Sequence, residues 1–214
     1  MLITSVTVGP VQTNCYIVAC EDTRKAIVVD PGDEPQRILE SIHKNKLDVI
    51  AIINTHGHFD HAGANAALHE AINAPIWIHE KDAFLLPILS EMGVLFGLDI
   101  PNSPPADAYL MGGQEITVGN LTLEVLDVPG HTQGGIALYA PDVLFSGDSL
   151  FAGSIGRTDL PGGNIKTLIG NIQNQLMELP DETVVYPGHG PATTIGEERK
   201  QTLFYKWVKD SDTS

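Results

Sequence analysis

The chain has 214 residues, a length that favours one domain, and hydrophobic residues make up 43% of it, enough to bury a sizeable core. It carries 12 basic and 27 acidic residues, for a formal net charge of −15. That balance argues against nucleic acid and against an anionic membrane surface as partners, because both are bound through clusters of Lys and Arg.

The sequence shows no targeting, membrane or disulfide signal. Residues 1–6 alternate like a strand and lack the basic start of a signal peptide, and no apolar run approaches the roughly 18 residues that a membrane span needs. Cys15 and Cys20 have no second pair beside them, so we interpret both as small core residues. We therefore expect a soluble, cytoplasmic, single-domain protein over residues 1–214, either a monomer or a small homo-oligomer.

The first half of the chain alternates strands with helices. Hydrophobic patterning predicts the following elements: strands over 2–8, 14–20 and 26–30, a helix over 34–45, a strand over 49–53, a helix over 61–73 and a strand over 76–79. Residues 80–105 are densely apolar and then broken by prolines. We predict a helix and a loop packed on the core there, with a lip over a pocket or a self-association surface as alternatives.

The second half begins with a run of predicted strands and then combines helices with a further strand. Its predicted elements are strands over 115–118, 121–128, 135–139, 143–146 and 183–186, and a helix over 165–179. Asn164 is the expected N-cap of that helix, and Thr194 with Glu197 forms a capping box for a last helix. Two batches of strands, each followed by helices, predict an α/β sandwich of two packed sheets with helices outside.

Three of the eight histidines fall within six residues, in the run His56-Gly57-His58-Phe59-Asp60-His61. This run directly follows a predicted buried strand. A loop that leaves a strand at this point can aim four side chains into one cavity. Imidazole and carboxylate groups are the ligands that zinc, iron or manganese take in proteins.

Three other predicted strands end in the same way. Each apolar strand is followed by a tight turn with glycine and then by a ligand-type residue: His131, Asp148 or His189. Strand carboxyl ends are where ligands bind in open α/β sheets. The early strand over 26–30 also ends in an acid, Asp30, before Pro31-Gly32.

The seven candidate ligands exceed what a single metal uses and suit two. They are His56, His58, Asp60, His61, His131, Asp148 and His189. Asp148 is the expected bridge because a carboxylate offers two oxygens. His43, His69 and His79 lack this context and are interpreted as ordinary histidines.

The run Thr55-His56-Gly57-His58-Phe59-Asp60-His61 resembles the signature of the metallo-β-lactamase superfamily. Pro129-Gly130-His131-Thr132, Gly147-Asp148 and Pro187-Gly188-His189-Gly190 are similar to its later motifs, in the same order, and the resemblance spans residues 1–207. It implies an αββα sandwich of two mixed β-sheets with metals at one edge. It also implies that His56, His58 and His131 hold the first metal, that Asp60, His61 and His189 hold the second, that Asp148 bridges them, and that Asp30 supports the ligands.

Departures from the family pattern narrow the reaction. Asp148 stands where many true β-lactamases have a cysteine, which, together with His61, argues against antibiotic hydrolysis. His58 stands where the flavo-diiron branch has an acid. The segment 153–159, with Gly162-Gly163-Asn164, is similar to short glyoxalase II-like proteins, which resemble hydroxyacylglutathione hydrolases. Long glyoxalase II enzymes carry a further helical domain that helps to hold glutathione, and we expect this chain to lack one.

The resemblance therefore implies a metal-dependent thioester hydrolase that acts on S-lactoylglutathione or a similar hydroxyacylglutathione. Two divalent ions (zinc, iron or manganese) would activate water, with Asp60 and Asp148 as the catalytic carboxylates. The alternative is a persulfide dioxygenase with one iron held by His56, His131 and Asp148. A lactonase, or a metal-binding module without turnover, is a further alternative.

Two groups of basic residues are candidates for substrate binding. Arg157 can clamp a substrate carboxylate, or it can pair with Asp159. Four basic residues near the end of the chain can form a basic rim or a solvated helix face: Arg199, Lys200, Lys206 and Lys209.

Overall fold

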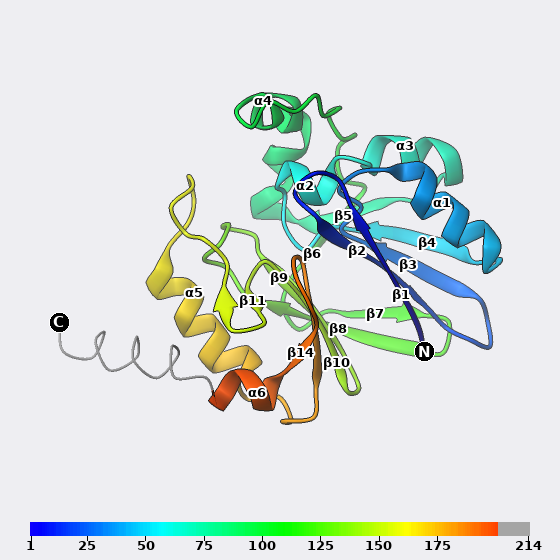
Figure 1. Cartoon of the computed structure of the whole chain (residues 1–214). Helices are drawn as coiled ribbons and strands as arrows, with labels where there is room; N and C mark the ends of the chain where they lie inside the picture. Colours follow the sequence, from blue (N-terminus) through cyan, green and yellow to red (C-terminus); the bar gives the residue numbers. More distant parts are fainter. Residues whose placement is uncertain (201–214) are drawn as a thin grey trace.

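The computed structural model describes residues 1–200. Two six-stranded mixed β-sheets pack face to face, and helices cover their outer faces (Figure 1). This arrangement confirms the predicted fold class. Within residues 1–200, no helix combines the length and the apolar character that crossing a membrane requires.

The first sheet has the order β1-β2-β3-β4-β5-β6. Its strands are β1 (Leu2–Val8), β2 (Thr13–Ala19), β3 (Lys25–Val29), β4 (Asp48–Ile53), β5 (Ile76–His79) and β6 (Ala108–Leu110). The pairs β1–β2 and β2–β3 are antiparallel, and β3 to β6 are parallel. The carboxyl ends of β3 and β4 therefore meet at one edge of the sheet.

The second sheet has the order β14-β13-β10-β9-β8-β7. Its strands are β7 (Glu115–Val118), β8 (Leu121–Asp127), β9 (Ile136–Ala140), β10 (Val143–Gly147), β13 (Val184–Pro187) and β14 (Thr193–Thr194). Among the strand pairs described in this sheet, β10–β13 is parallel and the others are antiparallel, so β10 and β13 deliver their carboxyl ends to the same edge. A short ribbon of β11 (Leu150–Phe151) and β12 (Ser154–Ile155) follows β10.

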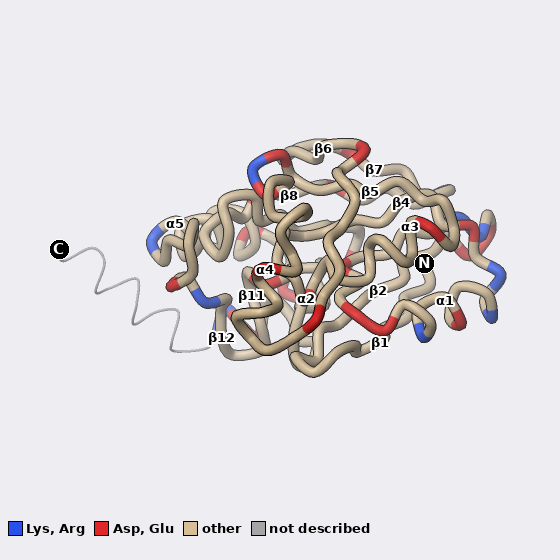
Figure 2. Tube along the Cα trace, turned by 90° about the horizontal axis from the view of Figure 1, so that it is seen from above, with Lys and Arg blue, Asp and Glu red and all other residues tan. Residues whose placement is uncertain are grey.

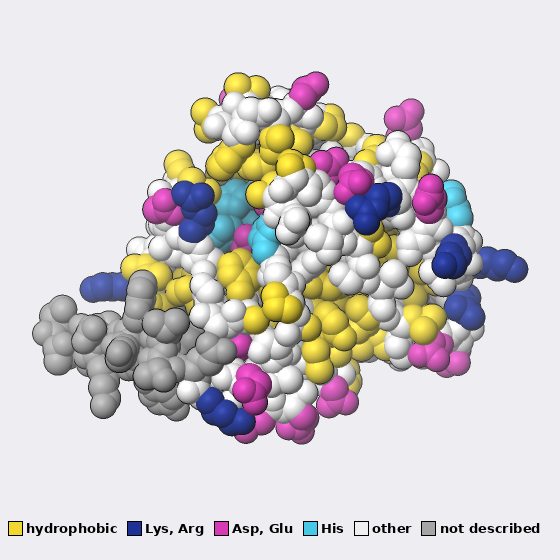
Figure 3. Space-filling model, viewed as in Figure 1, with side chains coloured by type: hydrophobic (Ala, Val, Ile, Leu, Met, Phe, Trp, Pro, Cys, Tyr) yellow, Lys and Arg dark blue, Asp and Glu magenta, His cyan; other side chains and the backbone are white. Residues whose placement is uncertain are grey.

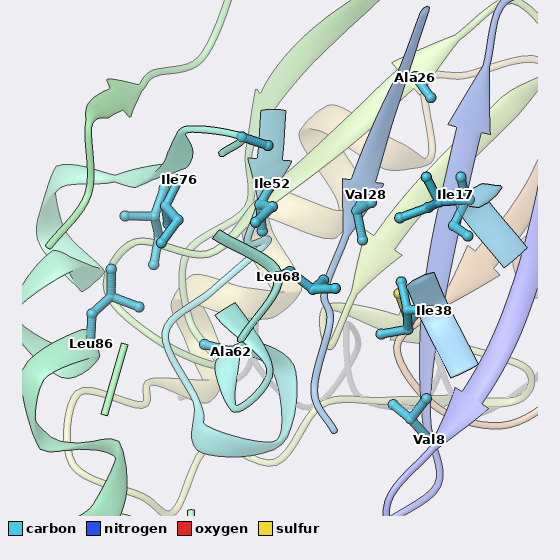
Figure 4. Packing of buried hydrophobic residues seen from close by; sticks show 14 of the residues in the cluster. Val8, Ile17, Ala26, Val28, Ile38, Ile52, Ala62, Leu68, Ile76 and Leu86 are labelled. Carbon is cyan, nitrogen blue, oxygen red and sulfur yellow. The ribbon is translucent and has the colours of Figure 1, made fainter. Parts of the chain in front are cut away.

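The core has an inner layer between the sheets and two outer layers under the helices. Alternation along each strand separates them: Tyr16 and Val18 of β2 face Phe145 of β10, while Ile17 points to the opposite face. On that outer face, residues of β2, β3 and β4 pack against Ile38 and Leu68 from two helices (Figure 4). The second sheet is covered in the same way, by a cluster that includes Leu168, Ile172 and Leu176.

The helices lie between the strands in sequence. They are α1 (Pro35–Lys44), α2 (Phe59–Ala62), α3 (Asn65–Ile72), α4 (Leu89–Val94), α5 (Ile165–Asn171) and α6 (Ile195–Lys200), together with a 3-10 segment η1 (Glu80–Ile88) and a π-helical turn η2 (Ile172–Leu176). Asn164 caps α5 as predicted, with its Oδ1 accepting from the Thr167 N–H at 2.9 Å. Thr194 likewise accepts from the Glu197 N–H at 3.2 Å.

Two predicted helices differ from the structure. The helix expected over 61–73 is two helices, α2 and α3, separated at Gly63-Ala64. A Cβ at Gly63 would lie 2.4 Å from the Gly32 carbonyl oxygen, so the chain bends where the loop after β3 packs closely against it. The helix expected over 165–179 changes to a π-helical turn at Ile172.

Residues 80–105 form η1 and α4 and then an irregular stretch. The buried side of this segment joins the core through Leu86 and Leu89, as predicted, whereas Phe84, Leu95 and Phe96 are exposed. The sequence reading missed β6, β11, β12 and β14, because strands of two or three residues carry too little alternation to be recognised.

Candidate metal centre

The run His56–His61 leaves the buried strand β4 and enters α2 at Phe59. Three other segments reach the same edge of the sandwich, after β8, β10 and β13, and they carry His131, Asp148 and His189. The structure brings all seven predicted ligands together there. Figure 3 shows histidine side chains at the bottom of a hollow beneath an apolar overhang formed by the α4 region.

His56, His58 and His131 form the first triad. One nitrogen from each lies within 4.8 Å of the others, and all three residues are buried. His58 Nδ1 and His131 Nε2 are 2.9 Å apart. His56 Nε2 is buried without a hydrogen-bond partner among the described residues. Leaving such an atom unpaired is costly, and a metal ion would remove that cost.

Hydrogen bonds on the far side of two rings assign which nitrogen faces the centre. His131 Nδ1 lies 2.7 Å from the Arg157 carbonyl oxygen, which can only accept, so Nδ1 carries a proton and Nε2 is the nitrogen that faces the centre. The Thr55 hydroxyl donates to Asp30 Oδ2 at 2.7 Å, so it accepts from His56 Nδ1 at 3.1 Å. Both rings therefore turn Nε2 toward the centre, and Nε2 is the nitrogen that a metal would bind there.

Asp60, His61 and His189 form the second triad. His189 Nε2 lies 3.2 Å from Asp60 Oδ2 and 3.3 Å from His61 Nε2. On its other side, His61 Nδ1 lies 3.0 Å from Asp30 Oδ2. Asp30 therefore holds His56 through Thr55, and it lies against His61 Nδ1, which makes no hydrogen bond of good geometry among the described residues. Asp30 has a left-handed φ of 52°.

Asp148 lies between the two triads. Its Oδ1 is 3.3 Å from His61 Nε2, and its Oδ2 is 3.6 Å from His131 Nε2 and 3.5 Å from His189 Nε2. Oδ1 is buried and has no hydrogen-bond partner of good geometry among the described residues. A Cβ at Gly188 would lie 2.2 Å from this oxygen, so the loop can approach Asp148 only with glycine there. One carboxylate oxygen thus faces the second triad and the other faces both.

The electrostatics hold His58 and Asp60 in the forms that bind metals. Burial lowers the pKa of His58 to about 4, with a contribution from His131, so its ring is neutral at pH 7. Burial raises the pKa of Asp60, but His61 and His189 outweigh that effect and hold the pKa below its ordinary value. Burial lowers the pKa of His61 and His189, but the neighbouring carboxylates outweigh that effect and raise the pKa of both, so these two rings release protons when a metal binds. A donor set of imidazoles and carboxylates fits zinc, iron and manganese.

Three of the candidate basic residues form ion pairs with neighbouring acids. The Arg157 guanidinium forms a two-point ion pair with Asp159, with both N···O distances at 2.8 Å, which was the alternative to a substrate clamp. Arg199 pairs with Asp181 and donates to the Leu179 carbonyl at 2.8 Å. Lys200 pairs with Glu197 at 3.3 Å. Lys206 and Lys209 lie outside the described residues.

The sequence reading missed the residues of β2 that hold the second triad. Asn14 Nδ2 donates to the Pro187 and Gly190 carbonyls at 3.1 and 2.9 Å, and the Tyr16 hydroxyl donates to the Pro187 carbonyl at 2.7 Å. Thr13 Oγ1 lies 3.4 Å from Asp60 Oδ2. The contacts made by Asn14 and Tyr16 join residues more than 170 positions apart, and the local sequence of an apolar strand does not predict them.

Acidic residues dominate the surroundings of the centre. Seen from above in Figure 2, acidic positions lie around α2 and β11 near the middle of the view, and most basic positions lie toward its ends.

The remaining histidines have ordinary roles. His69 Nδ1 donates to the Ala74 carbonyl at 2.9 Å, and His79 Nδ1 accepts from the Lys81 N–H at 3.1 Å.

Two curated proteins are similar to this chain over most of its length. It is 39% identical over 201 residues to "Probable metallo-hydrolase YqgX" of Bacillus subtilis, covering 92% of this chain and 94% of that protein. It is 38% identical over 202 residues to "Hydroxyacylglutathione hydrolase GloC" of Haemophilus influenzae, covering 90% and 92%.

Solved structures share the fold. BLEG-1 B3 metallo-beta-lactamase superposes with a TM-score of 0.88 at 38% identity, covering 95% of this chain and 99% of that one. TTHA1623 in a di-iron-bound form gives 0.86 at 41% identity, covering 92% and 98%. ETHE1 from Myxococcus xanthus gives 0.79 at 30% identity, covering 94% and 83%. The family model of the metallo-beta-lactamase superfamily matches residues 8–189, and the chain belongs to that superfamily.

Proposed function

We propose that this chain is a binuclear metallohydrolase that cleaves thioesters, with S-lactoylglutathione or a similar hydroxyacylglutathione as substrate. The observation that carries the proposal is the position of Asp148, whose Oδ2 lies between ligands of both triads, 3.6 Å from His131 Nε2 and 3.5 Å from His189 Nε2, while its Oδ1 faces His61 of the second triad. A likeness to a hydroxyacylglutathione hydrolase at 38% identity supports the choice of substrate.

The residues divide between two metal positions in this proposal. His56, His58 and His131 would hold one divalent ion, Asp60, His61 and His189 the other, and Asp148 both. Ions bound in this way lower the pKa of water to near 7 and polarise a carbonyl. A similar structure in a di-iron-bound form supports two metals, and zinc and manganese suit the same donor set.

The chain's own groups supply orientation and charge. Asp60 stays ionised, and its Oδ2, which lies 3.2 Å from His189 Nε2, would accept a hydrogen bond from the attacking water and so orient it. The leaving thiolate has an ordinary pKa of about 8.5 and departs without a separate general acid. Arg157 would reach a substrate carboxylate only by leaving Asp159, which makes it the least supported of the proposed site residues.

A persulfide dioxygenase is the second candidate. It would need only His56, His131 and Asp148 around one iron, and this arrangement of two histidines and a carboxylate leaves positions open for substrate. The likeness to ETHE1 at 30% identity lends it some support.

The test pairs elemental analysis of the purified full chain with thiol release from S-lactoylglutathione. Two metals per chain with thiol release support the hydrolase. Asp148→Ala should then lose both metals and reduce the rate to background, while Asp107→Asn, remote from the centre, should change neither. One iron per chain, oxygen uptake with glutathione persulfide and no thiol release would move the function to the dioxygenase. Faster turnover of a β-lactam than of the thioester would contradict both.

A further inference from the structure

Asp82 lies outside the ligand set, in η1, and its side chain is buried at 1% exposure. Its Oδ2 accepts from the Gly57 N–H at 3.0 Å, and its Oδ1 accepts from the Gly134 N–H at 2.6 Å. Each carboxylate oxygen thus holds one main-chain donor, and the two donors belong to different loops.

Those two loops carry the whole first triad. Gly57 lies between His56 and His58 in the loop after β4, and Gly134 lies three residues after His131 in the loop after β8. The 2.9 Å approach of His58 Nδ1 to His131 Nε2 therefore depends on how far apart these two loops are held. The Asp82 carboxylate is a direct link between them.

The packing around Asp82 leaves little freedom for that link. A Cβ at Gly134 would lie 2.8 Å from Asp82 Cγ, and a Cβ at Gly57 would lie 2.8 Å from the Asp82 carbonyl oxygen. Leu85, one turn further along η1, would also contact that Cβ at 2.9 Å. Both loops approach η1 as closely as glycine permits, which fixes their separation.

The second triad has a different support. The loop that carries His189 is held by Asn14 and Tyr16 of β2, through the carbonyls of Pro187 and Gly190. Neither of the two side-chain hydrogen bonds that Asp82 accepts among the described residues comes from that loop. Asp82 therefore holds the two loops of the first triad and β2 holds the His189 loop, whereas Asp30 lies behind one ligand of each triad.

Asp82 is also a buried acid that has no cationic side-chain partner within the described part of the chain. None of the ion pairs among residues 1–200 involves it. Buried charges are ordinarily paired or lie near metal ions. A cation held by the first triad would supply the compensating charge from the far side of the two loops.

We propose that Asp82 is a positioning residue for the first metal position: its carboxylate holds the His56–His58 loop and the His131 loop at the separation that metal binding requires. The inference rests on the proposed metal centre. Outer groups that orient metal ligands typically change metal affinity by about 10- to 100-fold when they are replaced. Replacement of Asp82 should therefore act on one metal position and spare the other.

The test measures zinc binding to the metal-free full chain by titration calorimetry in two backgrounds. His189→Ala weakens the second triad and leaves the first intact, and His58→Ala does the reverse. Asp82→Asn keeps the size of the side chain but leaves one of the two N–H groups without an acceptor. Asp107→Asn is the matched control, because Asp107 also accepts from a main-chain N–H, that of Ile76 at 2.8 Å, away from the centre.

We expect Asp82→Asn to weaken zinc binding about 10- to 100-fold in the His189→Ala background and less than about twofold in the His58→Ala background. Asp107→Asn should be silent in both, and circular dichroism should show the same fold throughout. Equal losses in the two backgrounds, or no loss in either, would overturn the role of Asp82. A parent chain that binds no zinc would overturn the metal centre itself, and with it this inference.

Discussion

At the scale of single residues, the centre depends on hydrogen bonds made behind the ligands. Thr55 is the clearest case, since its hydroxyl donates to Asp30 and accepts from His56, and its main-chain N–H donates to Asp30 Oδ1 at 2.7 Å. One threonine thereby fixes both an acid and the ring orientation of a ligand. The motif read from the sequence included Thr55 but gave it no role.

Replacing Thr55 with valine should destabilise the protein by about 1–3 kcal/mol, because Asp30 and His56 each lose a buried partner. Thr183 is the matched control, since its Oγ1 is buried without a hydrogen-bond partner among residues 1–200. Thr183→Val should be neutral or stabilising. Urea unfolding of both variants measures the difference, and equal effects would show that the Thr55 hydroxyl carries no special weight.

At the scale of elements, strand ends and helix starts place the ligand loops. α5 illustrates the connection, because its N-cap Asn164 also donates its main-chain N–H to the Gly130 carbonyl at 2.7 Å. The start of this helix is therefore tied to the residue before His131. A Cβ at Gly130 would lie 2.3 Å from the Leu168 N, so the loop and the helix are in close contact.

Asn164→Ala should lower the free energy of unfolding by about 1 kcal/mol, the usual loss for a helix N-cap, because the Thr167 N–H loses its acceptor. In Asn164→Asp a carboxylate oxygen takes the place of the amide oxygen and can accept the same hydrogen bond, so this variant should retain most of the stability. Thermal unfolding of the two variants compares them. If both variants lose the same amount of stability, the cap hydrogen bond does not account for the effect of Asn164→Ala.

At the scale of the whole molecule, each triad takes ligands from both sheets. His56, His58, Asp60 and His61 follow the first sheet, whereas His131 and His189 follow the second. Metal binding at either position would therefore join the two halves of the sandwich, in addition to the apolar layer between them.

Metal removal should consequently lower the melting temperature. A metal present at 100 times its dissociation constant stabilises the folded state by about 2.7 kcal/mol, which corresponds to roughly 5–10 °C for a chain of this size. Calorimetry with and without a chelator measures the shift. Asp148→Ala, which removes the group shared by both triads, should show a much smaller shift, and an equally large one would contradict its proposed position.

The sequence by itself determined the features that depend on residues close together in the chain. Hydrophobic residues in the strands follow a recognisable pattern, and Asn164 and Thr194 mark the starts of helices. Three histidines within six residues predict a metal-binding cluster. Four strand ends with glycine followed by a ligand-type residue were enough to predict which loops meet, because parallel strands deliver their carboxyl ends to one edge.

Tertiary contacts decided the rest. The helical pattern over residues 61–73 does not reveal that the loop at Gly32 packs against Gly63 and divides the helix. The sequence cannot show that Asp82 spans two ligand loops, that Asn14 and Tyr16 hold the His189 loop, or that Arg157 pairs with Asp159 while its carbonyl orients His131. Most of these are hydrogen bonds between residues far apart in the chain, and partners of that kind are chosen only when the two sheets pack together.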